Sequence, residues 1–160
     1  MTDFLSVLRL LSDADVAYVV VGGVASIVHG SSRLTQDIDV VYERSDANIE
    51  RLVRALADQH PYLRGAPPGL PFRWDTRTVK AGLNFTLTTD AGALDLLGHV
   101  AGGPDYEAIA QDAITVDLEH LSFRCVDLEQ LIALKKAAGR PKDLETIAEL
   151  EALREAQDDA

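Results

Sequence analysis

Two aspartates, Asp37 and Asp39, stand on either side of an isoleucine in the string DIDVV. Side chains alternate along a strand, so both carboxylates point to one side while Ile38 and Val40 point into the core. Burying like charges this close together is costly unless a positive group compensates. Two such carboxylates can converge on a hard cation such as Mg²⁺. The plainer alternative is that one aspartate caps a turn and the other is exposed.

A pair of glycines, Gly22 and Gly23, follows an apolar β-branched run and precedes a short apolar stretch. A strand-to-helix turn without side chains lets backbone N–H groups approach a phosphate, and the helix dipole favours an anion there. Taken alone, the pair is equally consistent with an ordinary turn. Thirteen residues separate it from Asp37, and the two features together predict a phosphate-binding turn beside a metal site.

A site of this kind needs a third carboxylate, and Asp95 is the candidate. It lies between Leu94 and Leu96 in the apolar string GALDLLG, where an aspartate is costly without a partner. We expect Asp95 to join the aspartate pair at the cation and to act as a base toward an acceptor hydroxyl. The alternative is an aspartate on an edge strand that faces water.

Basic residues that could bind a triphosphate are few in this acidic chain. Arg33 lies four residues before Asp37 and can either reach a phosphate or pair with a nearby acid. Lys135 shares a helical face with several apolar residues and is expected to face a cleft, whereas Lys136 rotates away from it. Arg140 and Lys142 extend this positive patch.

Hydrophobic periodicity predicts the elements that must position these residues. Helices are expected at about 3–13, 24–29, 46–59, 104–110, 127–139 and 141–157, with Asp46 and Asp143 as caps. Strands are expected at about 16–21, 37–43, 78–80, 84–88, 93–97, 114–118 and 121–125, with a loop over 61–74. This order predicts an α/β (α+β) fold, a mixed β-sheet flanked by helices. The main domain covers 1–126, and 127–160 form C-terminal helices packed on it.

Composition limits the classes of partner. The 160 residues include 26 acidic and 15 basic side chains and have a net charge of -11, which argues against binding nucleic acid through the bulk surface. A polyanion must therefore meet a local basic patch or arrive with a divalent cation. Cys125 is the only cysteine, so no internal disulfide forms and a cytoplasmic location is expected. The sequence predicts no signal peptide and no membrane span.

The string GG…HGSSRLTQDIDVV, followed by Asp95, resembles the nucleotidyltransferase superfamily that includes DNA polymerase β. Within it, the sequence looks most like small bacterial nucleotidyltransferases related to the abortive-infection type IV toxins. DLEQLIALKKAAGRPKDLETI is similar to their C-terminal helical segment. One departure concerns Gly23, because many relatives have a serine there that contacts phosphate.

The resemblance implies transfer of a nucleoside monophosphate from an NTP to a hydroxyl, with two Mg²⁺ ions or possible Mn²⁺ substitutes. Asp37 and Asp39 would hold both ions, Asp95 would hold the first, and Gly22, Gly23, Arg33 and Lys135 would bind the nucleotide. The acceptor could be tRNA or another RNA, a protein or a small molecule, and a cognate toxin or antitoxin is a possible partner. The alternative is a catalytically inactive antitoxin or interaction module built on the same fold.

Overall fold

The chain folds around a seven-stranded mixed sheet with the order β3-β4-β5-β2-β1-β7-β6. The computed structural model describes residues 2–100, 103–118 and 120–159. The strands are β1 (Tyr18–Val21), β2 (Asp37–Tyr42), β3 (Tyr62–Leu63), β4 (Phe85–Thr89), β5 (Gly92–Leu97), β6 (Ile114–Leu118) and β7 (Leu121–Cys125). The central strand β2 pairs in parallel with β5 and antiparallel with β1. The expected mixed sheet is therefore confirmed.

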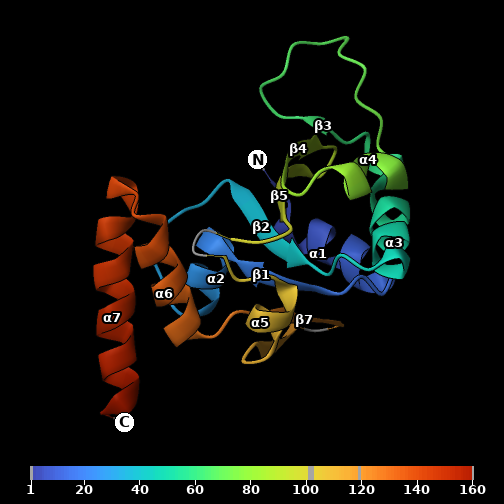
Figure 1. The fold of residues 1–160 in the computed structure, drawn as a ribbon. Helices are drawn as coiled ribbons and strands as arrows, with labels where there is room; N and C mark the ends of the chain where they lie inside the picture. The colour runs from blue at the N-terminus through green and yellow to red at the C-terminus, as the bar shows by residue number, and fades with distance from the viewer. Residues whose placement is uncertain (1, 101–102, 119, 160) are drawn as a thin grey trace.

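Helices cover the sheet in two groups (Figure 1). They are α1 (Phe4–Asp13), α2 (Gly22–Val28), α3 (Asp46–Leu56), α4 (Thr76–Ala81), α5 (Tyr106–Ala110), α6 (Leu128–Ala138) and α7 (Leu144–Asp158), with short 3₁₀ turns η1 (Ala57–Gln59) and η2 (Pro141–Asp143). Helix α3 packs against α1 and α4, while α6 packs between α2 and α7. None of the described helices is both long and apolar enough to cross a membrane.

The central strands form the core because most of their side chains are apolar and buried. All four residues of β1 are buried, and its Val19 and Val20 are fully inaccessible. On β2, Ile38 and Val40 are also fully buried, while the two aspartates that alternate with them are only partly buried. The alternation expected from the sequence therefore places the carboxylates of β2 on the opposite face from its two core residues.

The region between β3 and β4 differs from the sequence-based expectation. Residues 78–80 were expected to form a strand, and this is wrong because they belong to α4. The carboxylate of Asp75 accepts a hydrogen bond from the Thr78 N–H at 2.8 Å and caps that helix. The segment 61–74 also contains strand β3, which the sequence analysis assigned to a loop.

The expected cap Asp46 is wrong, whereas Asp143 stands at the N-cap position of α7 as expected but without a capping hydrogen bond. Helix α3 is capped by Ser45, whose hydroxyl accepts a hydrogen bond from the Asn48 N–H, and Asp46 is the first residue of the helix. The Asp143 side chain makes no capping hydrogen bond at the start of α7. It instead points toward two cations of the preceding segment, and this contact bears directly on the site.

Candidate active site

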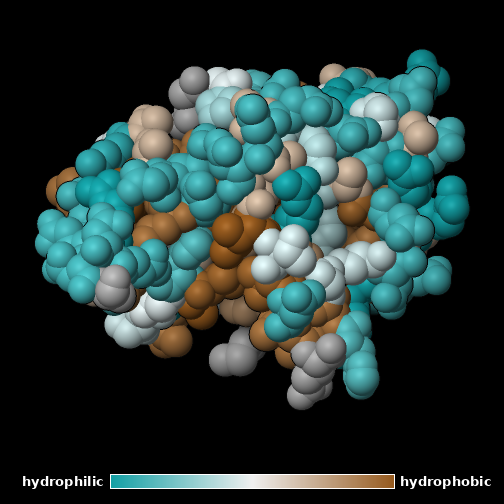
Figure 2. All heavy atoms as spheres, turned by 90° about the horizontal axis from the view of Figure 1, so that it is seen from below, coloured by the Kyte–Doolittle hydropathy of each residue, from teal (hydrophilic) through white to brown (hydrophobic). Residues whose placement is uncertain are grey.

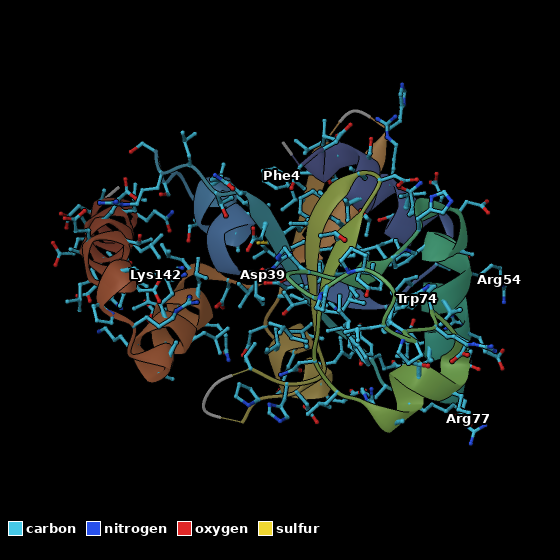
Figure 3. The ribbon with its side chains drawn as sticks, turned by 90° about the horizontal axis from the view of Figure 1, so that it is seen from above. Phe4, Asp39, Arg54, Trp74, Arg77 and Lys142 are labelled. Atoms are coloured by element: carbon cyan, nitrogen blue, oxygen red, sulfur yellow. The ribbon has the colours of Figure 1, made fainter. Side chains whose placement is uncertain are left out.

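The carboxylates of Asp37, Asp39 and Asp95 lie together on neighbouring strands. Asp39 on β2 is directly opposite Asp95 on the parallel strand β5, and Asp37 lies two residues earlier on the same face. One oxygen from each of the three carboxylates lies within 4.8 Å of the other two. The three residues are only partly buried, and Figure 3 shows Asp39 between the sheet and the C-terminal helices.

The charged form of the Asp39 carboxylate is disfavoured by its surroundings. Its Oδ1 is buried and accepts no hydrogen bond from any described residue. Desolvation, together with the neighbouring Asp95 and Asp37, raises the pKa of Asp39 to about 7. A buried carboxylate oxygen without a partner, next to two others, is a donor set that suits a hard divalent cation.

The turn at Gly22 and Gly23 requires glycine at both positions. Gly22 has φ +70, and a Cβ there would stand 2.2 Å from Oδ2 of Asp39. A Cβ on Gly23 would stand 2.6 Å from Oγ1 of Thr35. The backbone of the turn therefore packs directly against the carboxylate site. A serine in place of Gly23 would collide with Thr35, which fills that space.

Two hollows meet at the carboxylates. One, of about 220 Å³, is mainly polar and carries the cationic residues Arg33, Lys135, Arg140 and Lys142 along with Gly23 and Thr35. The other, of about 240 Å³, has an apolar side formed by Leu97, Val100, Leu131 and Leu134. Asp39, Asp95, Lys135 and Arg140 line both hollows. Figure 3 shows Lys142 coming from the helical side and Asp39 from the sheet.

Lys135 lies in this cleft, and a buried carboxylate holds it there. Its side chain is only 8% exposed, and Nζ lies 3.7 Å from Oδ1 of Asp143. Desolvation lowers the pKa of Lys135, while Asp143 opposes that shift. The other oxygen of Asp143 accepts a hydrogen bond from Nε of Arg140 at 2.7 Å. Lys136 points away and pairs with Glu151.

Arg33 is engaged with another residue. Its guanidinium pairs with Glu145 of α7, although the side chain stays about half exposed and lines the polar hollow. Of the two alternatives left open by the sequence, the structure contains the ion pair with an acid. Glu145 itself is 77% exposed, so the pair lies at the rim of the hollow, where ion pairs are weak.

Sequence reasoning missed Arg64, which is the cation closest to the carboxylates. Its Nη2 donates to Oδ1 of Asp95 at 2.5 Å and lies 3.5 Å from Oδ2 of Asp37. Arg64 directly follows β3, which has only two residues and gives little periodicity to detect. The sequence did indicate that a positive group must compensate the aspartates, but only a metal ion was considered for that role.

The surface around these elements is mixed in character. The face that carries α5, α6 and β7, seen from below, has a band of hydrophobic side chains among hydrophilic ones (Figure 2). Part of this face therefore offers apolar contacts.

The fold is that of the nucleotidyltransferases. The chain belongs to the family described as nucleotidyltransferase of unknown function (DUF6036), whose model matches residues 3–89. The matched segment includes Gly22, Gly23, Asp37, Asp39 and Arg64, while Asp95 lies beyond it. No curated protein matches the chain.

Solved structures share the fold over nearly the whole chain. Lincosamide antibiotic adenylyltransferase LnuA, solved with lincomycin, has a TM-score of 0.63 and 16% identity, covering 94% of this chain and 95% of its own. ANT(2")-Ia, solved with adenylyl-2"-tobramycin, has a TM-score of 0.55 and 15% identity, covering 96% and 93%. A putative nucleotidyltransferase from Thermotoga maritima has a TM-score of 0.53 and 14% identity, covering 98% and 91%. These likenesses support the nucleotidyltransferase-like fold.

Proposed function

We propose that this protein transfers a nucleoside monophosphate from a nucleoside triphosphate to a hydroxyl group, releasing pyrophosphate. The observation that carries the proposal is the convergence of Asp37, Asp39 and Asp95 beside the Gly22 turn and a polar hollow that basic side chains line. Membership of a nucleotidyltransferase family supports the same reaction class.

Divalent cations, Mg²⁺ or Mn²⁺, are part of this proposal. The three carboxylates offer oxygen ligands of the kind that these ions prefer, and the buried Oδ1 of Asp39 has no described partner. Bound cations would lower the pKa of the acceptor hydroxyl and neutralise charge on the triphosphate.

The remaining groups of the cleft suit nucleotide binding. Lys135, Arg140 and Lys142 line the polar hollow and would bind the β- and γ-phosphates there, once divalent cations neutralise the carboxylates of the same hollow. Asp143 pairs with both Lys135 and Arg140 and holds them in place. Asp95 lies at the junction of both hollows and would accept the proton of the acceptor hydroxyl.

We further propose that the acceptor is a small molecule. The net charge of -11 disfavours a polyanionic RNA. The second hollow has an apolar side and lies next to Asp95, as a site for a small organic acceptor would. Two structural neighbours are described as an antibiotic adenylyltransferase and as a complex with an adenylylated antibiotic, and these names are consistent with the same acceptor class.

A second candidate is a catalytically inactive module, such as the antitoxin of a toxin–antitoxin pair. The observation that favours it is the ion pair of Arg64 with Asp95, because it compensates the carboxylates without any metal. In this candidate the protein would bind a partner chain and transfer nothing.

One experiment separates the two candidates. The protein is incubated with each labelled NTP, Mg²⁺ and a panel of aminoglycosides, lincosamides, tRNAs and proteins. The proposal expects label on a small molecule, and Asp39→Ala should abolish that label. Label on RNA or protein would overturn the acceptor class alone. An absence of transfer and of NTP binding would favour the inactive module.

A further inference from the structure

The guanidinium of Arg64 is a fixed part of the carboxylate site. Its backbone N–H donates to the Thr86 carbonyl at 2.9 Å, and its Nη1 donates to the Leu87 carbonyl at 2.9 Å. Both acceptors belong to β4, so the side chain is anchored at its base and near its tip. This leaves Nη2 directed at the carboxylates of Asp95 and Asp37.

The position of Nη2 matters because the oxygens it contacts are ones that a cation would need. Oδ1 of Asp95 accepts its hydrogen bond at 2.5 Å, and Oδ2 of Asp37 lies 3.5 Å away. The Arg64 side chain is 28% exposed, against 22% for Asp95, so water screens this contact only in part. A guanidinium and a divalent cation repel each other at such distances.

We infer that Arg64 is a positioning residue that competes with the divalent cation for Asp95 and Asp37. Without the cation it neutralises the cluster and keeps the two strands' carboxylates together. The cation binds only when Arg64 gives up its contact with Asp95. The Arg64 guanidinium therefore sets the affinity for the divalent cation. That affinity stays weak as long as Arg64 contacts Asp95. This inference rests on the proposed function, because it takes the carboxylates as the cation site.

The test is the affinity of the purified full-length protein for Mn²⁺ alone, measured by electron paramagnetic resonance of the free ion. Arg64→Gln removes the charge, and Arg64→Lys keeps the charge but cannot hold Leu87 and Asp95 together as a planar fork does. Arg64→Gln should bind Mn²⁺ most tightly, Arg64→Lys less tightly and the natural protein most weakly. The dissociation constants of Arg64→Gln and the natural protein should differ at least tenfold. A merely structural role for Arg64 would weaken Mn²⁺ binding or leave it unchanged.

Arg154→Gln is the matched control, because Arg154 pairs with Glu129 and Glu151 and lines neither hollow of the site. Its Mn²⁺ affinity should equal that of the natural protein. Variants that differ by less than twofold, or that bind Mn²⁺ more weakly without Arg64, would overturn the inference. An Arg64→Gln chain that folds only when Mn²⁺ is present would support it, because the cation then replaces the lost guanidinium.

The same experiment separates this inference from the proposed function. Asp39→Asn is added to each variant, since only binding that this change abolishes belongs to the carboxylate site. If such binding exists but is equal with and without Arg64, the inference fails and the proposed function stands. If no variant shows binding that depends on Asp39, both fail.

Discussion

Gly22 of α2 and Asp39 of β2 pack so closely that position 22 has no room for a side chain. A Cβ at position 22 would stand 2.2 Å from Oδ2 and 2.9 Å from Cγ of Asp39. The phosphate-binding turn and the metal-binding carboxylate that the sequence predicts thus form one packed unit. A change at one must disturb the other.

We predict that Gly22→Ala disturbs both stability and cation binding. Its positive φ costs a side chain about 1–2 kcal/mol, and the collision with Asp39 adds about 1–3 kcal/mol. Gly69→Ala is the control, because Gly69 has φ +92 but nothing within 4 Å of the added carbon. Denaturant unfolding and Mn²⁺ titration of both variants check this. Equal losses in the two variants would show that the contact with Asp39 is unimportant.

A similar collision is predicted at Gly23, whose added Cβ would stand 2.8 Å from the Cβ of Thr35. Gly23→Ala should destabilise the protein by about 1–3 kcal/mol. Combined with Thr35→Gly, which removes the obstructing side chain, the loss should be clearly less than the sum of the two single changes. Denaturant unfolding of the double-mutant cycle measures the coupling, and additive losses would refute it.

Lys135, which is buried, is expected to contribute to nucleotide binding, whereas Lys136 is not. Lys135→Met should weaken binding of a non-hydrolysable NTP by roughly tenfold, or about 1.4 kcal/mol. Lys136→Met should leave binding unchanged, because Lys136 pairs with Glu151 outside the cleft. Isothermal titration calorimetry of both variants with the four NTP analogues distinguishes them. Equal effects would mean that only net charge is important.

The raised pKa of Asp39 predicts how the stability of the metal-free protein depends on pH. The folded protein binds this proton up to about pH 7, whereas the unfolded chain releases it near 3.8. The contribution is therefore fully present below about pH 4 and is lost as the pH rises through about 7. With EDTA present, the Tm of the natural protein should fall relative to Asp39→Asn between pH 5 and 8, by at least about 2 °C. A constant difference across this range would contradict the shift.

The alternation and spacing of a few residues were enough to predict the site from the sequence. Asp37, Ile38 and Asp39 alternate between solvent and core, and that alternation follows from strand geometry alone. An aspartate between two leucines led to Asp95, whose position opposite Asp39 depends on strand order. Strand order is set by the whole fold, so a local pattern indicates that Asp95 needs a partner but not which partner it meets.

Each error has a specific physical cause. Residues 78–80 look like a strand because a valine lies between polar residues, but the Asp75 cap decides for a helix. Arg64 was missed because β3 pairs through only two residues with β4, so its place in the sheet depends on tertiary contacts. Asp143 stands at the N-cap position of α7 as expected, but its carboxylate pairs with Lys135 and Arg140, which are stronger partners than backbone N–H groups.

The central claim is that three carboxylates hold divalent cations beside the glycine turn. The most direct measurement is anomalous diffraction from crystals soaked with Mn²⁺ and a non-hydrolysable NTP. The account predicts a manganese peak among the oxygens of Asp37, Asp39 and Asp95, with phosphates on the side of Lys135. A peak elsewhere, or no peak with Arg64 still bonded to Asp95, would contradict it.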